Sequence, residues 1–308
     1  MIQAIEQANP MCESFTFSPD FIVERVYVRT FNKNRLCTQS SLLDVSKWTV
    51  KPYPNAGAVP KLFITDGARD YMLKFAKKRQ NGTEIPYHIS EYISCRLAKS
   101  IGYNVQDVSL VIYHGQEACL IELFDEELIT FTGLGISTLD EQVLQYDLDL
   151  VDETVKSEKF LFDVRRFVWE TFLLDSFICN LDRHPNNWGF FRRSDGYVRA
   201  PLFDLGSSLY SINACSLPRM KDIDGYIKSY SGSAVKYQDN KHSFRNIIIS
   251  EKDGKLSELY QPFVSWLNNL STSCIDSVAV LLPRWEKYCS FVHEFISIQK
   301  RWFYGRGY

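Results

Sequence analysis

The sequence predicts an α+β fold in two lobes, a β-rich lobe over residues 1–125 and a mainly helical lobe over residues 126–308. In the first lobe, short runs of β-branched and aromatic residues are separated by turn residues and surround a single helical pattern. After residue 160, long runs with apolar residues every three or four positions dominate. An acidic stretch without a clear period, residues 125–158, lies between the two patterns and is expected to cross between the lobes.

The elements of the first lobe follow from local patterns. A turn at Asp66-Gly67 separates two short apolar runs, which predicts a hairpin. Apolar residues from Ile89 to Ile101 recur at spacings of three and four, and Gly102 is a suitable helix end. The predicted elements are, in chain order, a strand at 21–31, strands at 62–65 and 70–75, a helix at 85–101, and strands at 105–113 and 117–124.

The second lobe is predicted to begin with a long apolar helix at 160–180. A strand pair follows around Ser194-Asp195-Gly196, with its strands at 189–192 and 198–203. Residues 211–254 are polar, with Lys and Ser, and are expected to form a long excursion. Three helical runs complete the lobe, at 256–270, 272–282 and 283–303.

The composition is ordinary for a soluble globular protein and argues against several function classes. Of the 308 residues, 45% are hydrophobic and 23% are charged, and the net charge of -2 gives no reason to expect nucleic acid or an anionic membrane as a partner. The eight cysteines include no CxxC pair, so a zinc site is not indicated and buried thiols are expected. A basic leader with an apolar segment and an apolar run of about 18 residues are both absent. This predicts a cytoplasmic protein without membrane insertion and leaves secretion without a cleaved signal open.

The most informative stretch holds an acid, an amide and a second acid in loop-like surroundings. Asp182 and Asn187 are five residues apart after the long helix, and Asp204 follows the strand pair. Phosphoryl-transfer sites need one carboxylate to orient a hydroxyl, and an amide with a second carboxylate to hold Mg²⁺. A turn whose Asx side chains bond local backbone is the alternative for Asp182 and Asn187. Their combination with Asp204 and Gly206 favours the phosphotransfer interpretation.

A lysine and a glutamate in the first lobe complete this interpretation. Lys74 ends an apolar strand, as expected of a lysine that contacts the phosphates of ATP, and a solvated edge-strand lysine is the alternative. Glu91 lies beside the apolar stripe of the next helix, where a carboxylate would pair with Lys74. An ordinary surface position is the alternative for Glu91. Glu84, which precedes the helical pattern, is the rival partner for Lys74.

Weaker signals indicate where a nucleotide would lie. The segment 55–61 contains Gly57, which lets main-chain N–H groups approach phosphate, but it has no Walker A or G-x-G-x-x-G pattern. The end of the last strand, residues 122–124, has the position of a hinge that reads adenine. His184 lies between Arg183 and Pro185 and is expected to shape its loop. The residues expected at the nucleotide are Gly57, Ala58, Val59, Lys61, Lys74, Glu91, Glu122, Phe124 and His184.

Taken together, the motifs resemble those of the HipA-like serine/threonine kinases. The likeness covers about residues 50–290 and is carried by NLDRHPNNWG at 180–189, FDLG at 203–206, AGAVPKL at 56–62 and the helix at 90–102. The D-R-H-x-x-N motif is shared more loosely with phosphatidylinositol kinases, which have a related fold. The family includes bacterial toxin kinases and a shorter branch of cell-translocating kinases.

This resemblance implies a protein-kinase-like fold and a role for each motif residue. Asp182 would be the catalytic base, and Asn187 and Asp204 would be magnesium ligands. Lys74 would contact the ATP phosphates, and the loop with Gly57 would cover the nucleotide.

Two features depart from the full-length toxin kinases. Only about fifty residues precede Gly57, which suits the shorter branch. The nucleotide loop lacks the serine that many members autophosphorylate, and the serines at 229–233 are one substitute.

The function expected from the sequence is an ATP- and Mg²⁺-dependent serine/threonine protein kinase that also autophosphorylates. Its partners would be a protein substrate and an antitoxin or regulatory protein, in a bacterial cytoplasm. A phosphatidylinositol or small-molecule kinase is one alternative, which a basic membrane-facing loop would favour, but only the short run Lys77-Lys78-Arg79 is present. A nucleotide-binding pseudokinase is the other, and the presence of Lys74, Asp182, Asn187 and Asp204 argues against it.

Overall fold

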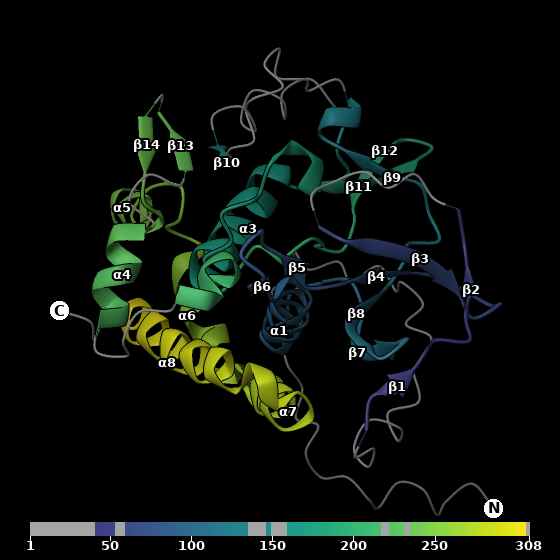
Figure 1. Cartoon of the computed structure of the whole chain (residues 1–308). Coiled ribbons are helices and arrows are strands. Elements are labelled where there is room, and N and C mark those ends of the chain that lie inside the picture. Colours follow the sequence, from purple (N-terminus) through teal and green to yellow (C-terminus); the bar gives the residue numbers. More distant parts are fainter. Residues whose placement is uncertain are drawn as a thin grey trace, which may run out of the picture. The chain divides into compact units, whose positions relative to one another are not determined.

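The computed structural model describes residues 41–52, 59–134, 146–148, 159–216, 222–230, 235–238 and 240–305. The elements below all belong to one unit, residues 41–308, defined by its internal contacts. The strand predicted at 21–31 and the loop residues Gly57 and Ala58 lie outside the described residues. Within the described part the predicted α+β succession is present, with strands around one helix followed by mainly helices (Figure 1). The lobe boundary at residue 125 stays a prediction.

Six strands pair into one mixed sheet that forms the β-rich part of the fold (Figure 1). In spatial order they are β1 (Leu43–Asp44), β7 (Val108–Tyr113), β8 (Gln116–Glu122), β4 (Asp70–Lys74), β3 (Lys61–Thr65) and β2 (Thr49–Val50). β1 runs parallel to β7, and the other neighbouring pairs are antiparallel. Because β4 lies between β3 and β8, its last residue is in the interior of the sheet rather than at an edge.

Two tight turns set the register of this sheet, one at the predicted Asp66-Gly67 turn and the other between the strands predicted at 105–113 and 117–124. Between β3 and β4, Gly67 has a φ of 93°, and the Asp66 carboxylate accepts two main-chain hydrogen bonds within the turn, each at 2.8 Å. Between β7 and β8, His114 and Gly115 have φ values of 45° and 76°, as a type I′ turn requires. Both predicted strand pairs are confirmed, with strand ends shifted by at most three residues.

The predicted helix at 85–101 is confirmed as α1 (Tyr87–Ser100). It packs on the sheet through β7 and β8 and also contacts α7 (Ser273–Leu281). Contacts on more than one side explain why polar residues of α1, including Ser90 and Glu91, are as buried as its apolar stripe. The chain leaves the helix at Gly102, whose φ of 99° suits a residue without a Cβ.

A second long helix, α3 (Val164–Ile178), precedes the loop that contains Asp182. The sequence predicted it at 160–180, and the start is a correction. Asp163 caps the helix by accepting a hydrogen bond from the N–H of Arg166 at 3.0 Å, and the three residues before it lie outside the helix. The helix ends at Cys179, which has a left-handed φ of 54°. That reversal turns the chain directly into the segment that contains Asp182.

The strand pair after the loop is β11 (Gly189–Arg193) and β12 (Gly196–Arg199), joined to β9 (Leu128–Thr130) in a three-stranded sheet. The predicted second strand extended to residue 203, and this end is a correction. The N–H of Ala200 still donates to the main-chain oxygen of Gly189 in β11 at 3.0 Å, but Leu202 instead exchanges main-chain hydrogen bonds with residues 104 and 106, each at 2.9 Å. This change of partner carries the following residues toward α1.

The predicted excursion at 211–254 contains regular structure, which is a further correction. Ser243 caps a helix by accepting a hydrogen bond from the N–H of Asn246 at 3.2 Å, and Phe244, Ile247 and Ile248 of that helix are buried. These elements are too short to give a clear period among the Lys and Ser residues. They are α4 (Ile223–Tyr230), β13 (Val235–Tyr237), β14 (Asn240–His242) and α5 (Phe244–Glu251), with β13 also paired to β10 (Tyr146–Asp147).

The three helical runs predicted at the end of the chain are confirmed, except that residues 256–259 precede the first helix. The α-helices of this part are α6 (Tyr260–Trp266), α7, and α8 (Glu286–Phe303), and α8 contacts α3, α4 and α7. In the described part of the chain, none of the helices has the length and apolar character needed to cross a membrane. The remaining short elements are β5 (Lys77–Lys78), β6 (Glu84–Ile85), η2 (Thr132–Leu134), η3 (Pro185–Asn187), η4 (Ser211–Ser216), η6 (Leu267–Asn269) and η7 (Pro283–Trp285).

Candidate active site

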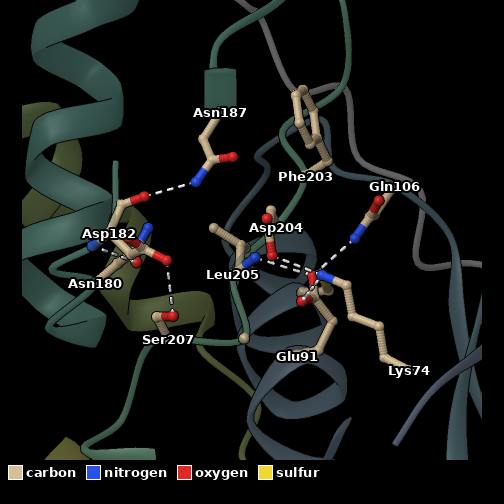
Figure 2. Close-up of polar contacts among 12 residues, drawn as sticks. Lys74, Glu91, Gln106, Asn180, Asp182, Asn187, Phe203, Asp204, Leu205 and Ser207 are labelled. Carbon is tan, nitrogen blue, oxygen red and sulfur yellow. Dashed lines mark hydrogen bonds and ion pairs between the residues drawn. The ribbon is translucent and has the colours of Figure 1, made fainter. Parts of the chain in front are cut away.

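Three charged residues from separate elements meet at the end of β4 (Figure 2). The Nζ atom of Lys74 lies 2.8 Å from Oε2 of Glu91 and 2.6 Å from Oδ1 of Asp204. Burial alone would lower the pKa of Lys74, but the charges of Asp204 and Glu91 outweigh it and raise that pKa. Burial alone would raise the pKa of Asp204, but the charge of Lys74 and its hydrogen bond outweigh burial and lower that pKa. Lys74 and Asp204 are therefore both charged at neutral pH.

Glu91 is fully buried and has hydrogen bonds on both oxygens. While Oε2 contacts Lys74, Oε1 accepts from Nε2 of Gln106 at 2.7 Å and from the main-chain N–H of Leu205 at 2.9 Å. Gln106 was not identified from the sequence, where it is a single amide before a strand with no motif around it. Through these contacts, Glu91 joins α1 to the segment that carries Asp204.

The segment around Asp204 has a conformation adapted to this junction. Asp204 itself has a left-handed φ of 55°, a conformation that residues other than glycine rarely adopt. At Gly206, a Cβ atom would lie 2.9 Å from Oε2 of Glu91 and 3.3 Å from the main-chain oxygen of Tyr87. Glycine therefore lets this segment pass close to the start of α1.

The loop that contains Asp182 and Asn187 is anchored by a buried arginine. Arg183 makes a bidentate ion pair with Asp175 of α3, at 2.9 and 3.0 Å, and both side chains are completely buried. Its Nη1 also donates to the main-chain oxygens of Asn187 at 2.7 Å and of Phe203 at 3.3 Å. Arg183 thus joins the loop to α3 and to the residue before Asp204. Asp175 was not identified from the sequence, although a carboxylate inside an otherwise apolar helix was a visible signal.

On this scaffold, Asp182 and Asn187 face the same region as Asp204 (Figure 2). Nδ2 of Asn187 donates to the main-chain oxygen of Asp182 at 2.6 Å, so its amide oxygen is directed away from that bond. Oδ2 of Asp182 accepts a hydrogen bond from the hydroxyl of Ser207 at 3.0 Å. Ser207 is a third residue that was not identified from the sequence, because its partner is 25 residues away.

The electrostatic surroundings of Asp182 suit a proton acceptor. Burial raises its pKa above the ordinary value of an aspartate, and the nearby Asp204 carboxylate acts in the same direction. The charges of His184 and Arg183 and the hydrogen bond from Ser207 oppose this rise without cancelling it. His184 itself lies 3.4 Å from the side-chain amide of Asn187 through Nε2. The structure therefore places His184 beside Asn187, and its role at the nucleotide stays a prediction.

Two of the weaker predictions can be placed at the entrance to this site. Lys61 is the cross-strand partner of Lys74 on β3, and burial together with the charge of Lys74 lowers its pKa. Val59 is half-buried just before β3, and Gly57 and Ala58 precede it outside the described residues. The rival carboxylate, Glu84, lies elsewhere and pairs with Arg284 at 2.7 Å. Glu91 is therefore the partner of Lys74.

The predicted hinge lies at the end of β8. The main-chain N–H groups of Glu122 and Leu123 already donate to the carbonyls of Asp107 at 3.2 Å and Asp70 at 3.0 Å. These two N–H groups are therefore already paired within the sheet, and the role of residues 122–124 as a hinge stays a prediction. The ring of Phe124 packs edge-on against Phe203, with ring centres 6.2 Å apart, so this end of the sheet contacts the residue before Asp204.

The oxygen atoms of this site fit a magnesium ion bound together with a nucleotide. Asp204 has one carboxylate oxygen on Lys74, and 44% of its side-chain surface is exposed. The amide oxygen of Asn187 would be a second hard ligand. Among the described residues there is no group of three or more His, Cys, Asp or Glu residues that could hold a metal. Mg²⁺ characteristically takes one or two carboxylates and completes its shell with waters and phosphates, so a small ligand set is what it requires.

Comparisons with known proteins agree with this geometry. The profile of the HipA-like C-terminal domain family matches residues 54–254. The serine/threonine-protein kinase CtkA of Helicobacter pylori is 28% identical over 227 residues, 70% of this chain and 66% of that protein. The serine/threonine-protein kinase toxin HipA of Shewanella oneidensis is 25% identical over 291 residues, 80% of this chain and 66% of that protein. The chain thus spans just under two thirds of the length of these curated relatives.

Two solved structures have a similar fold. The crystal structure of the Helicobacter pylori proinflammatory kinase CtkA matches with a TM-score of 0.70 at 22% identity, over 86% of this chain and 98% of that chain. Shewanella oneidensis HipA, in a complex with HipB and operator DNA, matches with a TM-score of 0.55 at 18% identity, over 86% of this chain and 68% of that chain. These matches confirm the predicted kinase-like α+β fold.

Proposed function

The chain belongs to the HipA-like C-terminal domain family, and from this premise we propose that it is a serine/threonine protein kinase dependent on ATP and Mg²⁺. It would transfer the γ-phosphoryl group of ATP to a hydroxyl group of a protein. The observation that carries the proposal is the meeting of Lys74, Glu91 and Asp204 opposite the loop with Asp182 and Asn187 (Figure 2). Known kinases use a lysine, a glutamate, two metal ligands and a base in these roles.

In this proposal, Lys74 and Glu91 form the wall that receives the phosphates. The ammonium group of Lys74 would contact the α- and β-phosphates, and Glu91 would hold it in place at 2.8 Å. Both side chains are at most 8% exposed, so the ion pair lies in a region of low dielectric where charges interact strongly. Lys61, opposite Lys74, would add a second positive charge beside the nucleotide.

Asp204 and Asn187 would hold Mg²⁺ through their side-chain oxygens. When bound, the ion would neutralise charge on the phosphate oxygens. Lys74 would then interact with phosphate as well as with Asp204, from which it is 2.6 Å away. The loop with Gly57, Ala58 and Val59 would cover the nucleotide, and His184 would contribute beside the phosphates.

Asp182 would orient the acceptor hydroxyl and receive its proton. A general base must be within about 2.6–3.2 Å of the proton-bearing atom and ionised at the working pH. The pKa of Asp182 is raised, mainly by burial, and this strengthens the carboxylate as a base. Catalysis would otherwise consist of positioning and electrostatic stabilisation.

We extend the proposal to partners and setting. HipA is described in one solved structure with HipB and operator DNA, and both curated relatives are bacterial. By analogy, a protein substrate and a regulatory protein of the antitoxin kind are expected here, in a bacterial cytoplasm. Isolation of the tagged chain from its host, followed by mass spectrometry of the bound proteins, would test for such a partner. A chain recovered alone under mild conditions would count against it.

The decisive experiment compares phosphate acceptors. Purified protein is incubated with Mg²⁺ and γ-labelled ATP, together with either a bacterial lysate or vesicles that contain phosphoinositides. Label on serine or threonine of proteins, absent with Asp182→Asn, is the expected result. Label confined to lipid would instead favour a phosphatidylinositol kinase. Nucleotide binding without any transfer would favour a pseudokinase.

A further inference from the structure

We propose that Ser207 is a positioning residue that holds the Asp182 carboxylate by a hydrogen bond, so that the other carboxylate oxygen faces the acceptor hydroxyl. The inference rests on the proposed function, since it assigns Ser207 a role at the same site. Its starting point is the 3.0 Å contact between Oγ of Ser207 and Oδ2 of Asp182 (Figure 2). Among the described residues, Ser207 is the one side chain that donates a hydrogen bond to this carboxylate.

The segment that carries the Ser207 hydroxyl is restrained by hydrogen bonds before and after residue 207. Before Ser207, the N–H of Leu205 is bound to Glu91 at 2.9 Å, and the oxygen of Gly206 accepts from the Ser211 hydroxyl at 2.9 Å. After it, the oxygen of Ser208 accepts from the hydroxyl of Ser90 at 2.7 Å. Main-chain movement at residue 207 is therefore restricted, and rotation of its side chain is the main freedom left.

The same segment is also joined to the chain just before Asp182. The N–H of Leu209 donates to the oxygen of Ile178, the last residue of α3, at 2.8 Å. Asp182 follows four residues later, and its N–H is bound to the side chain of Asn180 at 3.3 Å. The Ser207 hydroxyl and the Asp182 carboxylate thus extend from two backbones that are already linked, which fixes the distance between them.

A carboxylate bound through one oxygen loses rotation about its last bond, and its second oxygen then has a defined direction. Asp182 has few other restraints, because its side chain is only partly buried. The hydrogen bond also stabilises the ionised form and lowers the pKa of Asp182 against the effect of burial. Removal of the hydroxyl should therefore loosen the base and raise its pKa together.

The rival interpretation is that Ser207 is itself a phosphate acceptor. A hydroxyl 3.0 Å from the carboxylate has the separation that a general base requires. The restraints on residues 205–209 favour positioning, because an acceptor must also approach the phosphorus atom in line. The experiment below separates the two roles.

The test uses three variants of the full chain. Ser207→Ala removes the hydroxyl, and Ser207→Thr retains one. Ser208→Ala is the matched control, since the Ser208 hydroxyl is buried without a hydrogen-bond partner among the described residues. The pKa of the Asp182 carboxyl is followed by carbon NMR of aspartate-labelled protein, with Asp182→Asn to assign its signal.

The expected result has two parts. The pKa of Asp182 rises in Ser207→Ala and keeps its wild-type value in Ser207→Thr and Ser208→Ala. In phosphotransfer assays, kcat of Ser207→Ala falls about tenfold, as expected for the loss of one hydrogen bond to a charged group, while KM for ATP is unchanged. Ser207→Thr restores kcat.

Two results would overturn the proposal. One is an Asp182 pKa that is equal in wild type and Ser207→Ala, and the other is phosphate on Ser207 in wild-type protein incubated with ATP and Mg²⁺. If wild type transfers no phosphate at all but the pKa shift is present, the hydrogen bond stands and the proposed kinase function fails. The NMR measurement thus keeps the two conclusions distinguishable.

Discussion

The surroundings of Glu91 and of Asp182 differ although both regions belong to one site. Glu91 is fully buried, and its two oxygens receive hydrogen bonds from Lys74, Gln106 and the main chain of Leu205. Asp182 is partly exposed, and one oxygen receives a single hydrogen bond from Ser207. Both oxygens of Glu91 thus accept hydrogen bonds from the protein, whereas Asp182 keeps one oxygen available for a substrate.

This difference teaches how the two regions divide the proposed reaction. A carboxylate whose two oxygens both accept hydrogen bonds from the protein is suited to fixing neighbouring groups in place. The Glu91 region is therefore assembled before any substrate arrives and holds α1 in place against the Asp204 segment. The Asp182 region is completed only by the acceptor. Changes at Asp182 should affect chemistry and spare the fold, and changes around Glu91 should affect both.

The largest effect is expected for Asp182→Asn. The amide keeps the shape of the side chain and can still accept the Ser207 hydrogen bond, but it cannot take up a proton. We expect phosphotransfer to fall roughly 100- to 10,000-fold, the usual contribution of a general base. Turnover measured with labelled ATP tests this, and the melting temperature should stay within a few degrees of wild type. Near-normal turnover in this variant would remove Asp182 from the mechanism.

In the Glu91 region, Gln106→Glu should reduce both stability and nucleotide binding. The substitution preserves size but replaces the donor to Glu91 with a second carboxylate in a buried position. Loss of a hydrogen bond to a charged group is expected to lower the free energy of unfolding by about 2 kcal/mol. Urea unfolding at pH 7 measures this, and calorimetry measures the affinity for ATP with Mg²⁺.

The matched control for this variant is Gln116→Glu, the same substitution at an exposed position at the start of β8. It should change the free energy of unfolding by no more than a few tenths of a kcal/mol. Equal effects of the two substitutions would show that the Glu91 junction has no special importance.

The pH dependence of activity should report Asp182 and not Lys74. Because the pKa of Asp182 is raised, its base form is lost as the pH falls through a value above the ordinary 3.8. Below that point kcat/KM should fall about tenfold per pH unit. The pKa of Lys74 is raised, so its ammonium group persists to the alkaline limit of the assay. The residual activity of Asp182→Asn should lack the acidic limb, and a limb that persists in this variant would belong to another group.

The smallest effect is expected at a contact behind α1. Arg284 pairs with Glu117 at 2.7 Å and with Glu84 at 2.7 Å, and Trp285 donates to Glu117 at 3.0 Å. Arg284 is 49% exposed, so solvent screens its ion pairs and Arg284→Ala should lower the free energy of unfolding by about 1 kcal/mol or less. Urea unfolding at neutral pH measures the difference.

The sign of the pH effect at this contact follows from Glu117. Burial would raise its pKa, but the nearby His88 ring, 3.6 Å away, and hydrogen bonds from Arg284 and Trp285 outweigh burial and lower the pKa to about 2. The ion pair therefore stabilises the fold above the ordinary pKa of 4.5, and this contribution is lost as the pH falls from 4.5 to about 2. A difference between wild type and Arg284→Ala that stays constant over this range would contradict the assignment.

Much of the fold could be predicted from the sequence because its signals are local. The turns at Gly67 and at His114-Gly115 need particular backbone conformations, and the α1 stripe repeats over several turns. Predictions failed where contacts with residues outside the element set its ends. β12 ends before residue 203 because Leu202 forms its main-chain hydrogen bonds with residues 104 and 106. The elements within 211–254 are too short to give a recognisable period.

By itself, the sequence determined which residue types could perform phosphotransfer. The spacing of Asp182 and Asn187, the later Asp204, and Lys74 at a strand end are properties of the linear chain. Only the tertiary structure decided which side chains meet them. It selected Glu91 over Glu84 as the partner of Lys74, and it brought Gln106 and Ser207 to the two carboxylates. The physical reason is that these contacts join residues 15 to 25 positions apart on different elements, where periodicity carries no information about pairing.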